Sequence, residues 1–196
     1  MDYELAVVGT SWGGLTALGR LVSGLPPDFA LPLVVVQHRG RDAESILERL
    51  LQEQTQLAVC EASDKQPIEP GHIYLAPADY HLLVECGHLA LTTDPATRHS
   101  RPSIDVTFES AADSYRERLV GVVLTGANED GARGLRRVAD RGGVALVQDP
   151  ATAEAPAMPT AALRAVPSAQ VVPLAEIASR LTALSRVGAA APKGGR

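Results

Sequence analysis

A serine stands in a glycine-rich turn near the start of the chain. Residues 9–13 read Gly-Thr-Ser-Trp-Gly and match the pattern G-x-S-x-G, in which small residues permit a sharp turn between a strand and a helix. A serine placed there stands at a helix N-terminus, where unpaired N–H groups and the helix dipole favour negative charge. In ester hydrolysis that charge is the oxyanion of the tetrahedral intermediate. The turn therefore indicates a nucleophile at Ser11 and the chemistry of a serine esterase.

The same turn has a second interpretation, which is binding of a nucleotide phosphate. Residues 9–14 approach the dinucleotide fingerprint G-x-G-x-x-G. However, Ser11 occupies the position where the second glycine lets a pyrophosphate approach, and Trp12 adds bulk beside it. The second apolar run ends in Gln37 and His38, where an acidic residue is expected to bind a ribose. The motif alone leaves open both an esterase and a Rossmann-like nucleotide-binding signalling module.

A histidine follows the second apolar run. His38 comes directly after residues 33–37, and a histidine in this position is a candidate general base. A histidine held only by local hydrogen bonds is the ordinary alternative. The first two strands of a β-α-β unit are usually neighbours in a sheet, so we expect their carboxyl ends to bring Ser11 and His38 together.

Two acidic residues follow a third apolar run. Asp130 lies in the glycine-flanked segment 124–132, and an aspartate there can orient the imidazole and stabilise its protonated form. The alternative role is helix capping, which aspartate often performs. Glu129 is adjacent to Asp130 and could be confused with it. The order Ser–His–Asp differs from the Ser–Asp–His order of the α/β-hydrolase fold.

The elements that must position these residues follow from the hydrophobic pattern. Five short runs are apolar on both faces and predict buried parallel strands, at residues 5–8, 33–36, 119–124, 143–147 and 170–172. Stripes at helical spacing alternate with them, at residues 15–22, 46–51, 106–115, 135–138 and 177–184. We expect an α/β fold, with a doubly wound, mostly parallel sheet flanked by helices on both faces. Short β-type runs in the middle predict an antiparallel hairpin at about residues 72–93.

Length and composition limit the class of protein. The 196 residues fit one domain over 1–187, followed by a small-residue, polar tail at 188–196 that we expect to be disordered. A formal net charge of -5 argues against a nucleic-acid binder. Two cysteines outside any CxxC pair favour a reducing compartment. Without a signal peptide or an apolar stretch of membrane length, the sequence predicts a cytoplasmic protein with no membrane insertion.

Neither a metal nor a cofactor is expected. The remaining histidines show neither H-x3-H nor HExxH spacing, and they are His72, His81, His88 and His99. Residues 102–103, Pro-Ser, read as a helix start. Met158 is expected either in the core, which is the commoner case for methionine, or at the pocket.

Six stretches of the sequence resemble a known family. They are similar, in the correct order, to the catalytic domain of the bacterial chemotaxis protein-glutamate methylesterases, the CheB type, at residues 8–14, 36–38, 70–77, 101–106, 124–132 and 158–159. The resemblance runs from about residue 4 to about residue 166. It implies hydrolysis of γ-glutamyl methyl esters on chemoreceptors with release of methanol, and in some members deamidation of receptor glutamines.

The resemblance also implies roles for individual residues. Ser11 corresponds to the nucleophile, His38 to the general base and Asp130 to its carboxylate partner. The backbone N–H groups of Trp12 and Ala127 fall at the family's oxyanion hole. The implied partner is the methylated cytoplasmic region of a chemoreceptor. A catalytically idle scaffold is a further alternative, against which the intact serine, histidine and aspartate argue.

Some features depart from the family pattern. The sequence begins at the catalytic domain, so regulation is expected to be absent or supplied in trans by a receiver-domain protein. Trp12 replaces a small residue, and its side chain can narrow the pocket. The stretch 39–42 differs from the common pattern, which bears on substrate preference. Arg98 and Arg101 either steer an acidic receptor segment or are solvated loop residues.

Overall fold

A seven-stranded sheet forms the centre of the computed structural model, which describes residues 3–38 and 46–187. All its strand pairs are parallel. Across the sheet the strands follow the order β3 (Ala58–Glu61), β4 (His72–Leu75), β2 (Leu33–Gln37), β1 (Leu5–Thr10), β7 (Leu119–Val123), β8 (Val144–Gln148) and β9 (Gln170–Val172). The predicted tail at 188–196 lies outside the described residues.

The register of the central strands brings three chain segments together at the carboxyl ends of the strands. On β1, Thr10 lies opposite Gln37 of β2, and Gly9 lies opposite Val123 of β7. Ser11, His38 and the segment after β7 therefore leave the sheet side by side. The prediction that the first two strands are neighbours in the sheet is confirmed.

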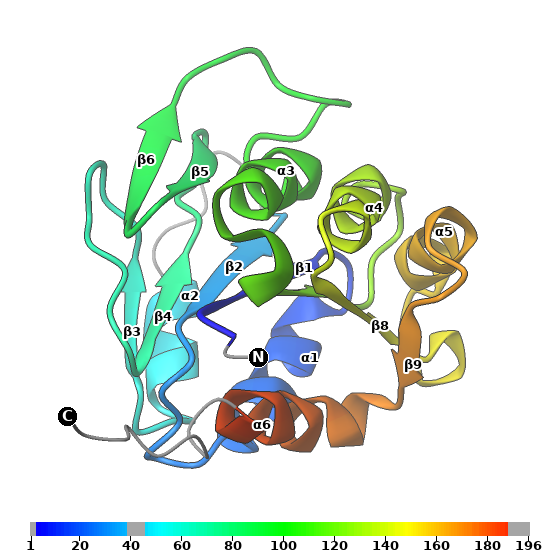
Figure 1. Cartoon of the computed structure of the whole chain (residues 1–196), viewed down its shortest axis with the longest axis horizontal. Coiled ribbons are helices and arrows are strands. Elements are labelled where there is room, and N and C mark those ends of the chain that lie inside the picture. Colours follow the sequence, from blue (N-terminus) through cyan, green and yellow to red (C-terminus); the bar gives the residue numbers. More distant parts are fainter. Residues whose placement is uncertain (1–2, 39–45, 188–196) are drawn as a thin grey trace, which may run out of the picture.

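Helices cover both faces of the sheet (Figure 1). One face packs against α1 (Gly14–Ser23), α2 (Ile46–Gln52) and α6 (Ile177–Val187). The other face packs against α3 (Ile104–Tyr115), α4 (Ala132–Asp140) and α5 (Ala157–Ala165), with a hairpin of β5 (His81–Glu85) and β6 (His88–Thr92) beside α3. Three short 3-10 helices connect elements, at Arg116–Arg118, Pro150–Thr152 and Leu174–Glu176. This arrangement confirms the predicted doubly wound α/β fold.

The expected antiparallel hairpin is shorter than the sequence suggested. Residues 81–92 do form an antiparallel pair around a tight turn in which Gly87 has φ 82°. Residues 72–75 were expected in the same hairpin, and this part of the prediction is wrong because β4 pairs in parallel with both β2 and β3. Ile73 and Leu75 are fully buried, as interior parallel strands require.

Helix α5 was not expected from the sequence. Its first turn contains Pro159, directly after Met158. Proline is tolerated in a first helical turn because its missing N–H would have no partner within the helix. Met158 is fully buried against the sheet, which confirms the core expectation for this residue.

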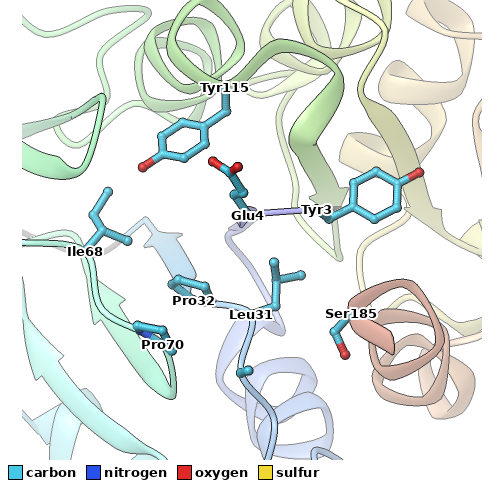
Figure 2. A pocket seen from close by; sticks show the side chains of 9 residues that line it. Tyr3, Glu4, Leu31, Pro32, Ile68, Pro70, Tyr115 and Ser185 are labelled. Atoms are coloured by element: carbon cyan, nitrogen blue, oxygen red, sulfur yellow. The ribbon is translucent and has the colours of Figure 1, made fainter. Parts of the chain in front are cut away.

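A cavity of about 320 Å³ lies at the opposite end of the sheet (Figure 2). Its lining includes Glu4, Pro32 and Pro70, each of which comes directly or within two residues before a strand. Glu4 accepts a hydrogen bond from Arg118. Because this cavity faces the amino ends of the strands, it is separate from the edge that carries Ser11 and His38.

No helix in the described part of the chain is both long and apolar enough to cross a membrane.

The close contact of α3 and α4 gives a stability prediction at Gly134. A Cβ there would lie 2.5 Å from Phe108 Cβ and 3.1 Å from the backbone of Asp105, so we expect Gly134→Ala to lower the free energy of unfolding by ~1–3 kcal/mol. Gly19→Ala is the matched control, because its Cβ would meet only the movable end of Gln54. That variant should gain up to ~1 kcal/mol from helix propensity. Urea unfolding measures both, and equal effects would contradict the tight crossing.

Candidate active site

Ser11 and His38 line one cleft at the carboxyl ends of β1 and β2. The cleft has a volume of about 520 Å³, and Ala127 from the segment after β7 completes its wall. The backbone N–H of His38 donates to the carbonyl of Thr10 at 3.1 Å, which continues the strand pairing to the serine turn. The structure thus brings the predicted nucleophile and base to the same surface.

The side chain of Gln37 joins the two strand ends. Its Nε2 donates to the carbonyl oxygens of both Ser11 and His38, each at 2.9 Å. A Cβ on Gly14 would lie 1.9 Å from Gln37 Oε1, so this arrangement requires glycine at position 14. In the sequence, Gln37 is notable only because it is not the acidic residue that a ribose site requires. Its bridging role follows from the pairing of β1 with β2.

His38 is hydrogen-bonded to Asp130. The distance from His38 Nε2 to Asp130 Oδ2 is 2.8 Å, and the Asp130 side chain is only 2% exposed. The neighbouring Glu129 is 71% exposed and lies 3.9 Å from Arg98. The structure therefore assigns the contact with the imidazole to Asp130, as the sequence analysis expected.

The carboxylate of Asp130 accepts further hydrogen bonds from groups at the start of α3 and from the N-cap of α4. At distances of 2.7–3.0 Å the donors are Ser103 Oγ and the backbone N–H groups of Ile104, Asp105 and Gly131. The first N–H groups of a helix have no partner within it, so the carboxylate caps α3. The alternative considered for Asp130 was capping of a helix; the N-cap of the helix that follows it, α4, is Gly131.

These donors determine the ionisation of Asp130. Burial by itself raises the pKa of this carboxyl group, but the hydrogen bonds from His38 and from the backbone of Asp105 and Ile104 outweigh it. The pKa therefore lies below its usual value. Asp130 stays charged at neutral pH and can stabilise a protonated imidazole beside it.

Asp105 caps the neighbouring helix in return. Its Oδ1 accepts from the backbone N–H groups of Gly131 and Gly134 at 2.9 and 2.8 Å. Burial raises the pKa of Asp105, and the nearby charge of Asp130 adds to this effect. This role was not predicted from the sequence, although an acidic residue between Ile104 and Phe108 on a buried helix face was a signal for it.

The tautomer of His38 follows from Asn128. The backbone N–H of Asp130 donates to Asn128 Oδ1 at 3.0 Å, so the other end of the side-chain amide is the NH₂ group. That group lies 3.2 Å from His38 Nδ1. Since an NH₂ group donates, Nδ1 accepts and carries no hydrogen, and Nε2 donates its hydrogen to Asp130. The lone pair with which the imidazole can act as a base is therefore on Nδ1.

Two backbone N–H groups beside the cleft are available as donors. The N–H groups of Ser11 and Gly126 are used, since they donate to the carbonyls of Thr125 and Ala155 at 3.0 Å. Within the described residues, no hydrogen bond uses the N–H of Trp12 or Ala127. The Trp12 side chain is 66% exposed, so it stands at the rim of the cleft and leaves most of its surface in solvent.

The other residues singled out from the sequence have different environments. Arg101 donates hydrogen bonds to Asp79 and to the carbonyls of Thr93 and Asp94, so it holds its own loop in place. Arg98 is 54% exposed and remains a candidate for steering. The stretch 39–42 lies outside the described residues. Among residues 3–38 and 46–187, no group of three or more His, Cys, Asp or Glu side chains could hold a metal ion.

Comparisons with known proteins agree on one family. The family model described as CheB methylesterase matches residues 6–181. A Leptospira interrogans protein named "Putative protein-glutamate methylesterase/protein-glutamine glutaminase" is 42% identical over 91% of this chain and 93% of its own length. A Burkholderia lata protein-glutamate methylesterase/protein-glutamine glutaminase is 39% identical over 93% of this chain and 55% of its own length.

A solved structure is also similar. The crystal structure of the Thermotoga maritima CheB methylesterase catalytic domain matches with a TM-score of 0.90 and 30% sequence identity. The match covers 94% of this chain and all of that one. The two proteins therefore share the whole architecture described above.

The depressed pKa of Asp130 predicts how acid changes stability. A lowered pKa in the folded state contributes stability above the unfolded value, near pH 4, that is lost as the pH falls through the folded value. We expect Asp130→Asn to lower the free energy of unfolding at pH 7 by ~2–3 kcal/mol. The deficit should begin to shrink below about pH 4, where the carboxyl group becomes protonated in the unfolded chain, and it should disappear as the pH falls through the lower folded pKa of wild-type Asp130.

The exposed Asp140, which pairs with Arg136 on the same helix, provides the control. Asp140→Asn should change the free energy of unfolding by at most ~0.5 kcal/mol. Denaturant unfolding of both variants between pH 3 and about pH 7 measures the effect. A deficit of Asp130→Asn that is independent of pH would show that Asp130 is not charged in the folded protein.

Proposed function

This chain belongs to the CheB methylesterase family, and from that premise we propose that Ser11, His38 and Asp130 perform its serine hydrolase chemistry. The reaction is removal of methyl esters from glutamate side chains of chemoreceptor-type proteins, with release of methanol. The observation that carries the proposal is the hydrogen bond of His38 to a buried, charged Asp130 in a cleft shared with Ser11. The nucleotide-binding alternative has no support in the comparisons.

The first half of the reaction is acyl transfer to the enzyme. Ser11 Oγ attacks the ester carbonyl while its proton moves to the lone pair of His38 Nδ1. The imidazolium that forms is stabilised by the Asp130 carboxylate at Nε2. As the tetrahedral intermediate collapses, Nδ1 returns the proton to the leaving methoxide. Methanol departs, and the γ-glutamyl group remains esterified to Ser11.

The oxyanion of each tetrahedral intermediate needs donors in place before the reaction. The backbone N–H groups of Trp12 and Ala127 are the proposed pair, since both border the cleft and no hydrogen bond among the described residues uses them, whereas the preceding N–H groups of Ser11 and Gly126 already have partners. One such donor contributes about 3–4 kcal/mol to lowering the barrier. Trp12 follows Ser11 at the start of α1, so the helix dipole adds to the stabilisation.

The second half returns the enzyme to its starting state. Water attacks the acyl-enzyme, His38 Nδ1 takes the water proton, and the proton then passes to Ser11 Oγ as glutamate leaves. The same steps with ammonia as the leaving group convert glutamine to glutamate. The names of the Leptospira and Burkholderia relatives, which include protein-glutamine glutaminase, support this additional activity.

The partner and the location are part of the proposal. The partner is the methylated cytoplasmic region of a chemoreceptor, and the site of action is the cytoplasm. Control by a receiver-domain protein in trans remains a prediction from the sequence. Arg98 is exposed and lies 3.9 Å from Glu129, in the segment after β7. We expect Arg98 to steer an acidic receptor segment, while Arg101 is held within its loop.

Replacement of Ser11 tests the proposed nucleophile. Ser11→Ala should reduce methanol release from methylated receptor fragments by at least about 10³-fold, while urea unfolding remains close to wild type. Ser23→Ala, at an exposed serine at the end of α1, should leave the rate unchanged. Wild-type rates from Ser11→Ala would exclude Ser11 as the nucleophile.

Replacement of Gln37 tests whether the two strand ends must be held together. Gln37→Leu removes the donor to both carbonyls, and a small displacement of reacting groups lowers rates by about 10²-fold. We therefore expect kcat to fall by that order with little change in KM. Gln52→Leu is the matched control, because Gln52 also donates to two carbonyls, those of Thr55 and Leu57, remote from the cleft. Equal effects of the two variants on kcat would contradict the positioning role.

A further inference from the structure

We propose that Asn128 is a positioning residue: its side-chain amide occupies Nδ1, the basic nitrogen of His38, until substrate enters the cleft. The inference rests on the proposed function, because it concerns the nitrogen that must accept the proton of Ser11. The Asn128 NH₂ group donates to that nitrogen, Nδ1, at 3.2 Å. No role for Asn128 followed from the sequence, in which the resemblance identifies only the nearby Ala127 and Asp130.

The orientation of the Asn128 amide is determined by the backbone. Its Oδ1 accepts the N–H of Asp130 at 3.0 Å in a turn that spans two residues. Reversing the amide would bring NH₂ against N–H, and both groups would lose a hydrogen bond. The NH₂ group therefore faces His38 for the same reason that Oδ1 faces Asp130.

The neutral imidazole has one lone pair that can accept a hydrogen. Both the Asn128 amide and the Ser11 hydroxyl require it. In the part of the chain that the structure describes, the side-chain hydrogen bonds of His38 go to Asp130 and Asn128, and none joins it to Ser11. A serine is a weak nucleophile unless a base takes its proton. Activation of Ser11 therefore requires the Asn128 amide to leave Nδ1.

The location of Asn128 allows substrate to cause this change. Asn128 is exposed and directly follows Ala127, which lines the cleft and carries a proposed oxyanion donor. A receptor segment whose ester carbonyl reaches Ala127 also reaches the Asn128 side chain. Substrate thus displaces the amide and frees the base, while the empty enzyme keeps a poorly reactive serine.

Other charged groups around His38 are the same in both Asn128 variants considered below. Among the described residues, Asp130 binds the ring, with Asp105 and Arg133 behind it. Glu154 lines the same cleft. Glu129, beside Asn128, is exposed and lies 3.9 Å from Arg98. A change in the pH dependence of an Asn128 variant is therefore attributable to Asn128.

Two substitutions separate the contact with His38 from the contact with the turn. Asn128→Asp retains an oxygen for the Asp130 N–H but replaces the donor at Nδ1 by a carboxylate oxygen. That oxygen favours an imidazole protonated at Nδ1, so the acid limb of the kcat/KM profile should move to higher pH by about one unit or more. Asn128→Ala removes the donor without adding charge and should shift the limb less in the same direction.

Reaction of Ser11 with a serine-directed phosphonate measures the activity of the free enzyme. Above the acid limb, Asn128→Ala should label about fivefold faster than wild type, the factor set by one net hydrogen bond. The ¹⁵N resonance of His38 Nδ1 should move in this variant toward the position of a free imidazole lone pair. Glu129→Gln is the control in the same loop and should behave as wild type in all three measurements.

The outcomes distinguish this inference from the proposed function. Slower labelling of Asn128→Ala, or an acid limb and a His38 ¹⁵N spectrum that match wild type in both variants, would overturn the inference. Because Asn128→Asp retains the turn, a loop disturbed in Asn128→Ala cannot account for a wild-type profile of the aspartate variant. Failure of wild-type protein to release methanol would instead contradict the proposed function, while the ¹⁵N spectra would still report on the contact.

Discussion

The buried carboxylate of Asp130 is the constraint on which the rest of the site depends. A buried charge is costly unless its oxygens receive hydrogen bonds, and here the donors come from three separated parts of the chain: β2, the start of α3 and the start of α4. Their common acceptor fixes these segments relative to one another. The same hydrogen bonds keep Asp130 ionised and orient His38, so the contacts that stabilise the fold also prepare the base.

The two helices beside the site depend on each other in the same way. Asp130 precedes α4 and caps α3, while Asp105 of α3 caps α4. This exchange requires the helix starts to approach closely, which is why a Cβ on Gly131 would lie 2.6 Å from Ile104. Stability and catalysis therefore share residues at this point, and a substitution that loosens the α3–α4 crossing also displaces the partner of His38.

Much of this could be predicted from the sequence, because the relevant signals are local. Apolar runs gave the central strands, and polar residues at their ends gave Ser11, His38 and Asp130. Contacts between distant segments left no such signal. The bridging of two strand ends by Gln37, the capping of α3 by Asp130 and the role of Asp105 depend on pairings that single-sequence patterns do not encode. The pairing of strand β4 was predicted wrongly because a short apolar run fits either a hairpin strand or an interior strand of a parallel sheet.

The central claim is that Ser11 forms a covalent intermediate, with His38 Nδ1 as its base. The most direct measurement is acid-quenched mass spectrometry of the full chain during its first turnover with a methylated receptor peptide. We expect an adduct equal to the peptide minus methanol, mapped by proteolysis to Ser11 and absent from His38→Ala. An adduct on another residue, or methanol release in the first turnover without any adduct, would contradict it.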